Sequence, residues 1–289
     1  MRAQPRNNIW RCKDFVFDQP LPLIMGILNV TPDSFSDGGA YLGTSQALAH
    51  AQDMLDAGAD IIDVGGESTR PGSQEVDVSE ELARVLPVVR DLARKGVCVS
   101  IDSRHFQTVA ACLREGASII NDITGFADRS MLELAASSKV GCVVMHMRGN
   151  PKTMQEDPHY DDVVSEVSAF LLDHAHRLEQ AGVEHDRICI DPGPGFGKNY
   201  DQNLALLKAT DHFANLGDSS YPPYLLMAAW SKKRFVGQMT GVEEASERMA
   251  GSVTTALLAA GQGAGVLRIH DVAPTVEALK VMQAAGYFG

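Results

Sequence analysis

Short apolar runs and longer amphipathic stretches alternate along the chain from about residue 23 onward. The apolar runs lie at 23–28, 60–64, 97–101, 118–121, 141–145, 187–190, 224–228 and 265–269. Each has the length and composition of a buried parallel strand. Stretches with helical spacing lie between them, at 45–57, 79–95, 105–115, 130–138, 161–181, 200–213, 244–261 and 272–285. Gly before several of the runs is typical of a helix C-cap that leads into a strand.

Eight strand–helix units with short connections predict a single α/β domain, a (β/α)₈ TIM barrel. A doubly wound open sheet is the alternative, because strand order cannot be read from a sequence. We divide the chain into an N-terminal extension, 1–22, and a barrel, 23–289. Apolar and polar residues alternate in the segment 10–20 around Lys13-Asp14, and we expect a hairpin there that covers the amino-terminal end of the barrel.

Composition narrows the class of protein. Of the 289 residues 45% are hydrophobic and only 6% aromatic, which favours a parallel α/β protein over a β-sandwich. The formal net charge of −12 argues against a general nucleic-acid surface, which needs a basic field. The negative net charge does not exclude a small anion pocket, because anion binding there depends on local Arg and Lys side chains and backbone dipoles.

Cysteines and apolar segments indicate the compartment. The five cysteines are an odd number, widely spread and without a C-x-x-C pair, so we expect reduced, buried thiols rather than zinc ligands or disulfides. No apolar stretch reaches membrane-spanning length, and no apolar core of a signal peptide follows the N-terminus. These features predict a cytoplasmic protein that does not bind membranes.

Polar residues stand at the end of nearly every predicted strand, where barrels collect their function. In chain order they are Asn29, Asp63, Asp102, Asn121, His146, Asp191 and Ser231, followed by Arg268 with His270. Strand ends that simply meet polar loops would explain one or two such residues, but explain poorly a whole ring of them. The chemistry of the ring suits a flat, nitrogen-rich heterocycle bound along its edge by a carboxylate and an amide.

Three later segments carry further chemistry. The glycine-rich turn 191–198 fits neither the phosphate-loop pattern nor the dinucleotide fingerprint, so we interpret it as a tight turn under a ligand. The basic run 231–237 begins with Ser231 directly after a strand, and we expect Ser231 to cap a helix whose N-terminus and Lys233 receive an anion. Arg268 and His270 alternate along a strand, so both face one side, and two cationic or donor groups on one face suit a diphosphate.

Two loops are the most informative features of the chain. Residues 27–39 and 63–72 each begin at the end of an apolar run and turn abruptly polar and glycine-rich. Such loops can place backbone N–H groups and a guanidinium around an anion.

Together these segments resemble dihydropteroate synthase, a folate-pathway enzyme. The resemblance runs from about residue 23 to 272 and rests on the ordered segments 27–39, 63–72, 100–103, 120–126, 191–198 and 268–272, with support from 143–147 and 231–237. It implies an enzyme that joins 6-hydroxymethyl-7,8-dihydropterin diphosphate to p-aminobenzoate and releases diphosphate. It also implies a homodimer and Mg²⁺ as cofactor.

The resemblance assigns roles residue by residue. Asn29 would hold Mg²⁺ at the diphosphate, which Thr69, Arg70, Arg268 and His270 would bind. The pterin would contact Asp102, Asn121, Met145, Asp191 and Lys233. The p-aminobenzoate would meet Ser231 beside Phe35, Thr69 and Pro71, and we expect sulfonamides to compete there. Catalysis would depend on Asp33, Arg70, Asp102 and Lys233.

The implied mechanism needs no enzyme nucleophile. Diphosphate leaves, the pterin ring delocalises the positive charge, and the neutral arylamine attacks; carboxylates such as Asp102 would stabilise the cation. We expect the loops 31–43 and 67–74 to move and to exclude water from the cation.

The chain departs from the family pattern at three places. Lys232, Ala229 and Gln202 stand where Arg, Gly and His are usual in the family. Lys cannot copy a planar guanidinium. The departures at Lys232 and Ala229 keep a non-catalytic binding paralogue open. A pterin-barrel methyltransferase is the other alternative, because it shares the architecture and the carboxylates at the pterin edge; the loop 69–71 and the pair Arg268 and His270 favour a diphosphate substrate instead.

Overall fold

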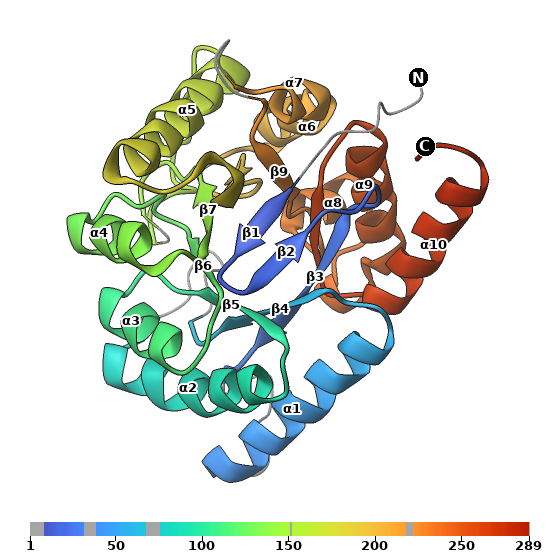
Figure 1. Cartoon of the computed structure of the whole chain (residues 1–289). Helices are drawn as coiled ribbons and strands as arrows, with labels where there is room; N and C mark the ends of the chain where they lie inside the picture. The colour runs from blue at the N-terminus through green and yellow to red at the C-terminus, as the bar shows by residue number, and fades with distance from the viewer. Residues whose placement is uncertain (1–8, 32–38, 68–75, 151, 218–221, 289) are drawn as a thin grey trace.

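Eight parallel strands close into a barrel with helices around it (Figure 1), as the alternation of apolar runs predicts. The computed structural model describes residues 9–31, 39–67, 76–150, 152–217 and 222–288, with backbone only for 39–42. The strand order around the barrel is β10-β3-β4-β5-β6-β7-β8-β9. The (β/α)₈ barrel is therefore confirmed, and the open sheet is excluded because β10 pairs with β3.

The barrel strands lie within one residue of the predicted apolar runs at each end. They are β3 (Leu23–Asn29), β4 (Ile61–Gly65), β5 (Cys98–Asp102), β6 (Ile119–Asp122), β7 (Gly141–Met145), β8 (Ile188–Asp191), β9 (Leu225–Ala228) and β10 (Val266–Ile269).

The helices follow the predicted stretches with some differences. They are α1 (Gly39–Asp56), α2 (Val78–Arg94), α3 (Phe106–Arg114), α4 (Arg129–Ser138), α5 (Val163–Ala181), α6 (Tyr200–Lys208), α7 (Thr210–Ala214), α8 (Arg234–Thr240), α9 (Met249–Gly261) and α10 (Val272–Ala284), with short 3₁₀ turns η2 (His185–Arg187) and η3 (Ala245–Glu247). The stretch expected at 200–213 is two helices that meet at Ala209, and α1 begins before its expected start at 45. Asp side chains cap several helices, as at Asp128 before α4 and Asp162 before α5.

A hairpin lies across one end of the barrel (Figure 1). β1 (Trp10–Cys12) pairs antiparallel with β2 (Phe15–Phe17), within the segment where alternation predicts a hairpin. Trp10 is fully buried with the apolar residues that open the strands, such as Met25, Ile61 and Val266. The hairpin therefore fills the amino-terminal end of the barrel and leaves the opposite end for chemistry.

Glycine at the start of β7 makes room for this hairpin. A Cβ on Gly141 would lie 2.5 Å from Cys12 Sγ and 3.2 Å from Trp10 Cε2. The indole Nε1 of Trp10 donates to the carbonyl of Arg187 at 3.0 Å, so the buried polar atom is paired. All five cysteines are free and buried.

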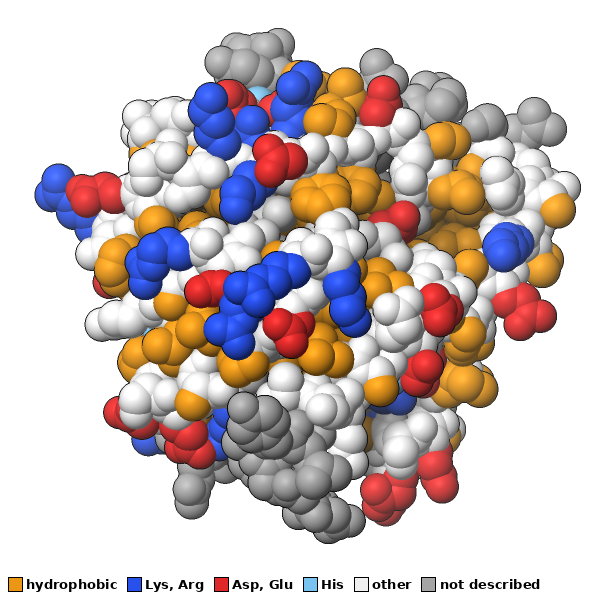
Figure 2. Space-filling model, turned by 60° about the horizontal axis from the view of Figure 1, so that its bottom comes forward, with side chains coloured by type: hydrophobic (Ala, Val, Ile, Leu, Met, Phe, Trp, Pro, Cys, Tyr) orange, Lys and Arg blue, Asp and Glu red, His pale blue; other side chains and the backbone are white. Residues whose placement is uncertain are grey.

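The outer layer packs the helices against the outward faces of the strands in a second apolar cluster. One face of the molecule is shown in Figure 2, where acidic and basic side chains are interspersed with hydrophobic ones. None of the helices within the described ranges is long and apolar enough to cross a membrane.

Candidate functional site

The interior of the barrel changes from apolar to polar along the strands. Side chains alternate between the inside and the outside of a barrel, so the residues two positions beyond the buried floor also face inward. At these places stand Asp63 after Ile61, Asn121 after Ile119, Asp191 after Cys189 and Arg268 after Val266. Alternation of side chains along each strand therefore turns these four residues of the predicted polar ring toward the inside of the barrel.

A guanidinium and two carboxylates form the centre of the barrel mouth. Arg268 Nε donates to Asp63 Oδ2 at 2.6 Å, and Arg268 Nη2 donates to Asp102 Oδ2 at 2.5 Å. The side chains of Arg268 and Asp102 are each 15% exposed, whereas Asp63 is fully buried. Burial in this site is deep enough that each charge depends on its neighbours.

The titration of this group follows from its surroundings. Burial raises the pKa of Asp102 to about 7, and the positive charge of Arg268 opposes that rise. Burial also disfavours the charged guanidinium, but Asp63 and Asp102 together hold the pKa of Arg268 above its usual value. The arrangement keeps Arg268 charged and places Asp102 close to its titration point at neutral pH.

Asn121 and Asp63 join β6 to this group. The amide Nδ2 of Asn121 donates to Asp63 Oδ2 at 3.2 Å. Within the described part of the chain, the other carboxylate oxygen, Oδ1 of Asp63, has no hydrogen-bond partner. Asp63 is therefore the link that sets both the Arg268 side chain and the Asn121 side chain.

Asp191 and Lys233 lie on the other side of the mouth. Asp191 is buried, and its Oδ1 accepts from Gly193 N at 2.8 Å at the start of the glycine-rich turn. Lys233 Nζ donates to the carbonyl of Pro194 in that turn at 2.6 Å and lies 4.8 Å from the centre of the Phe196 ring. Burial lowers the pKa of Lys233 to about 8, and the negative charge of Asp191 opposes that shift.

Burial also disfavours the charged form of Asp191. It raises the pKa of Asp191, while the charge of Lys233 works against it. A buried carboxylate and ammonium that favour each other's charged form are suited to bind the donor and acceptor edge of a flat ring.

The prediction that Ser231 caps a helix is wrong, because α8 begins at Arg234 and its N-cap residue is Lys233. Lys232 adopts a left-handed backbone with φ 57°, which turns the chain before the helix starts. Ser231 instead faces β10: its Oγ lies 2.9 Å from His270 Nδ1 and accepts from His270 N at 3.1 Å.

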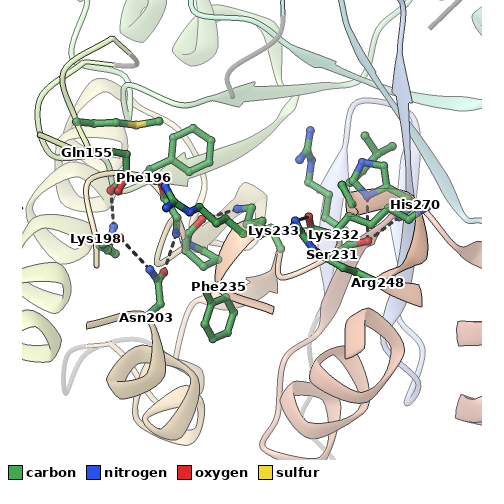
Figure 3. A pocket seen from close by; sticks show the side chains of 18 of the residues that line it. Gln155, Phe196, Lys198, Asn203, Ser231, Lys232, Lys233, Phe235, Arg248 and His270 are labelled. Atoms are coloured by element: carbon green, nitrogen blue, oxygen red, sulfur yellow. Dashed lines mark hydrogen bonds between the residues drawn. The ribbon is translucent and has the colours of Figure 1, made fainter. Parts of the chain in front are cut away.

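One cavity of about 640 Å³ brings predicted residues from distant parts of the sequence together (Figure 3). It is lined by six of the candidates, namely Asn29, Asp102, Ser231, Lys233, Arg268 and His270. Asn121, Met145 and Asp191 are buried around it rather than on its surface, and Met145 pairs in register with Asp191.

Five candidates and both loops fall wholly or partly where the structure gives no description. Asp33, Phe35, Thr69, Arg70 and Pro71 lie outside the described residues, as do most of 31–43 and 67–74. Glu67 can be described. It accepts two bonds from Arg104, at 3.0 and 3.1 Å, and one from Val76 N at 3.2 Å.

His146 is a second correction, because it does not line the cavity. Its Nδ1 accepts from Lys198 Nζ at 2.8 Å, and its ring meets that of Phe170 on α5 edge to face. Burial lowers the pKa of His146 to about 2, so it is neutral. Met145 faces inward two residues after the floor residue Val143, so alternation directs His146, the next residue, to the opposite side.

Lys198 is a residue whose role the sequence did not reveal. Its buried ammonium also donates to the carbonyls of Gly193 and Phe196, at 2.9 and 3.0 Å. It therefore holds the turn that carries Pro194 and follows Asp191. The only sequence signal was a lysine within a glycine-rich turn.

The described residues include no group of three His, Cys, Asp or Glu side chains that could hold a metal ion. Mg²⁺ commonly takes only one or two protein ligands and completes its shell with phosphate oxygens and water. Asn29 offers an amide oxygen on the cavity wall, which fits that limited role when a diphosphate is bound.

Comparison with known proteins agrees with this geometry. A family profile described as "Pterin binding enzyme" matches residues 25–270. The dihydropteroate synthase of Escherichia coli K12 is 47% identical over 264 residues, covering 91% of each chain. A Xanthomonas albilineans dihydropteroate synthase solved with 4-aminobenzoic acid has a TM-score of 0.89 and 42% identity, covering 97% of this chain and 98% of that one. The Yersinia pestis enzyme solved with a sulfonamide drug has a TM-score of 0.88 and 42% identity, covering 96% of this chain and 98% of that one.

Proposed function

The chain belongs to the dihydropteroate synthase family of pterin-binding enzymes, and we propose that its barrel mouth carries out the reaction of that family. It joins 6-hydroxymethyl-7,8-dihydropterin diphosphate to p-aminobenzoate and forms 7,8-dihydropteroate and diphosphate, a step of folate biosynthesis. The observation that carries the proposal is that Asn29, Asp102, Ser231, Lys233, Arg268 and His270 line one cavity. The resemblance stated from the sequence is confirmed by the family match.

Pterin recognition is assigned to the buried side of the mouth. Asp191 accepts hydrogen bonds from the amino group and ring N–H of the pterin, Asn121 pairs with ring nitrogens, and Lys233 donates to the ring carbonyl. Lys233 Nζ meets the Pro194 carbonyl in the turn that follows Asp191, and Asn121 is bonded to Asp63, which holds Arg268. Burial strengthens such bonds because water does not compete for them.

The chemical step follows from the charges around Arg268. As diphosphate departs, Arg268 and His270 stabilise the anion, and Asp102 stabilises the positive charge that develops on the pterin. In the structure Arg268 is held by Asp63 and Asp102, so the cation and its carboxylates are in place before substrate arrives. The arylamine then attacks the methylene carbon and loses a proton.

Mg²⁺ is part of the proposal as the cofactor. Asn29 would contribute one oxygen ligand, and the ion would supply charge neutralisation at the diphosphate. Dialysis against a chelator, followed by addition of Mg²⁺, tests this requirement. Full activity after rigorous chelation would remove the ion from the proposal.

The p-aminobenzoate end is assigned to Ser231 and its surroundings, with Phe35, Thr69 and Pro71 completing the site. The Yersinia pestis relative binds a sulfonamide drug. We therefore expect sulfonamides to inhibit competitively with p-aminobenzoate. An inhibition constant hundreds of times above the KM for p-aminobenzoate would contradict this assignment.

The direct test measures dihydropteroate by chromatography after purified protein is incubated with both substrates and Mg²⁺. We expect product that depends on both substrates. A methyltransferase would give no dihydropteroate but would transfer a methyl group from a methyl donor, and a binding paralogue would bind the pterin without turnover. The family relationship favours the synthase over both.

A homodimer is proposed as the assembly. Helices α9 and α10 lie side by side (Figure 1), and each exposes an apolar side chain, Leu258 at 50% and Val281 at 66% exposure. Apolar side chains exposed on adjacent helices can be covered by a second subunit. Sedimentation velocity tests it: we expect the mass of two chains, and Leu258→Glu with Val281→Glu should shift the mass toward one chain. A wild-type protein that sediments as a monomer at micromolar concentration would refute the dimer.

The location proposed is the cytoplasm. Its support is the set of five unpaired, buried cysteines, because cytoplasmic proteins keep their thiols reduced. Cell fractionation followed by immunoblotting tests it, and enrichment in an extracytoplasmic fraction would contradict it.

A further inference from the structure

The turn between β9 and α8 directs two site residues to different sides of the cavity. Ser231 faces His270 on the β10 side, with 2.9 Å between Oγ and Nδ1. Lys233 extends toward the turn after β8, where Nζ meets the Pro194 carbonyl at 2.6 Å. Figure 3 shows Ser231 near His270 and Lys233 reaching the opposite way, toward Phe196. The residue between them therefore sets their relative placement.

That residue, Lys232, has an unfavourable backbone conformation. Its φ is 57°, in the left-handed region, where a side chain is crowded against the backbone and glycine is preferred. A conformation of this kind persists only when surrounding contacts impose it. Lys232 also forms an ion pair with Asp271, with 2.9 Å between Nζ and Oδ1.

The start of α9 supplies those contacts. Lys232 N donates to Ser252 Oγ at 2.9 Å, and Arg248 Nη1 donates to the Lys232 carbonyl at 3.0 Å. Ser252 Oγ in turn donates to the Arg248 carbonyl at 2.7 Å. Both peptide groups of the left-handed residue are thus held by two side chains of one helical turn.

Arg248 is fixed as firmly as the residue it holds. Its Nε donates to the Val242 carbonyl at 3.0 Å, and its Nη2 donates to the Glu243 carbonyl. The guanidinium occupies space that Gly237 leaves open, since a Cβ on Gly237 would lie 2.5 Å from Arg248 Nε. A rotation of Arg248 away from Lys232 would break all three bonds to carbonyl groups.

We propose that Arg248 and Ser252 are positioning residues for the reaction, which hold Lys232 in its left-handed conformation and thereby set Ser231 and Lys233 across the cavity. The inference rests on the function proposed above, because it assigns the two ends of this turn to the two substrates. Arg248 lies on the cavity wall, but its hydrogen bonds to backbone carbonyls mark it as a support rather than a group that reacts.

The first experiment removes the hydroxyl that holds the Lys232 N–H. Ser252→Ala should lower kcat/KM at least tenfold and raise the KM for p-aminobenzoate, because Ser231 and Lys233 lose their fixed placement. Ser252→Thr, which keeps the hydroxyl, should retain most of the activity. Arg248→Lys, which keeps the charge but cannot reach three carbonyls, should behave like Ser252→Ala. Equal kcat and KM values in wild type and Ser252→Ala would overturn the proposal.

The decisive experiment is a rescue that a merely structural role would not produce. Glycine adopts left-handed backbone without strain. Adding Lys232→Gly to Ser252→Ala should therefore raise kcat/KM at least fivefold above that of Ser252→Ala alone. Lys232→Ala in the same background is the matched control: it removes the same side chain and the same ion pair with Asp271, but leaves the strain. If Gly and Ala restore activity equally, or neither does, the left-handed residue is not what the two side chains hold in place.

Failure of this inference differs from failure of the proposed function. A wild-type protein that forms no dihydropteroate refutes the function. The clamp, meaning the hydrogen bonds of Arg248 and Ser252 with the backbone of Lys232, is then tested by hydrogen exchange of the Lys232 amide. Ser252→Ala should accelerate this exchange at least tenfold, and Ser252→Thr should not. An active wild-type enzyme without the glycine rescue refutes only the clamp.

Discussion

Arg268 Nη2 lies 2.5 Å from Asp102 Oδ2, so the last strand of the barrel in chain order, β10, is tied by an ion pair to β5, 166 residues earlier. β10 and β5 are not neighbours in the barrel, and the pair crosses its mouth. Asp63 on β4 completes the group from a third strand. Three charges from three strands thus meet where the substrate would react.

The titration of Asp102 predicts an acid limb in the pH profile. Burial raises its pKa to about 7, so the carboxylate loses its charge as the pH falls below that value. Because that charge pairs with Arg268 and would stabilise the pterin cation, kcat/KM should fall on the acid side with an apparent pKa near 7. Asp102→Asn should lower kcat by about 10²–10³ and remove the acid limb. A limb unchanged in Asp102→Asn would assign it to another group.

Lys233 predicts the opposite dependence for pterin binding. Burial lowers its pKa to about 8, so the ammonium loses its proton as the pH rises through that value. If the charged form binds, the Kd of a pterin should rise about tenfold between pH 7 and pH 9. Calorimetry at several pH values measures this. Lys233→Met is the control, because titration of the pterin itself would persist in that variant while the contribution of Lys233 would vanish.

The apolar runs and the amphipathic stretches between them predicted eight strand–helix units and favoured the barrel, but the open sheet was excluded only by the observed pairing of β10 with β3. Each of the eight barrel strands lies within one residue of its predicted run at either end. The same pattern predicted the polar strand ends, and it orients Asp63, Asn121, Asp191 and Arg268 inward by strand alternation alone. His146 was wrongly expected in the ring: it follows the inward-facing Met145 by one residue, so alternation turns it outward, where it contacts Lys198.

Features that depend on distant contacts could not be predicted. Ser231 is a favoured helix cap by type, but the left-handed Lys232 moves the helix start to Arg234. That conformation depends on Arg248 and Ser252, at the N-cap and in the first turn of another helix, α9. Likewise the hydrogen bonds from Arg104 to Glu67 join two loops, and the sequence around either residue does not predict them.

Asp191 predicts a separation of binding from folding. Asp191→Ala should abolish detectable pterin binding, because the buried acceptor for the ring edge is lost, while the far-ultraviolet circular dichroism stays that of the wild type. Its bond to Gly193 N is also lost, so a small loss of stability is expected, about 1 kcal/mol. Asp173→Ala on the exposed face of α5 is the control and should bind normally. Unchanged calorimetric affinity would remove Asp191 from the pterin site.

Trp10 predicts how much the hairpin stabilises the barrel. Trp10 is fully buried against the barrel floor, and its indole N–H is paired with the Arg187 carbonyl. Trp10→Ala should lower the free energy of unfolding by about 3–5 kcal/mol, since it leaves a large cavity and an unpaired carbonyl. Val16→Ala, in the same hairpin but 58% exposed, should change it by less than about 0.5 kcal/mol. Urea unfolding followed by circular dichroism compares the two, and a similar small loss in both would show that the barrel folds without support from the hairpin.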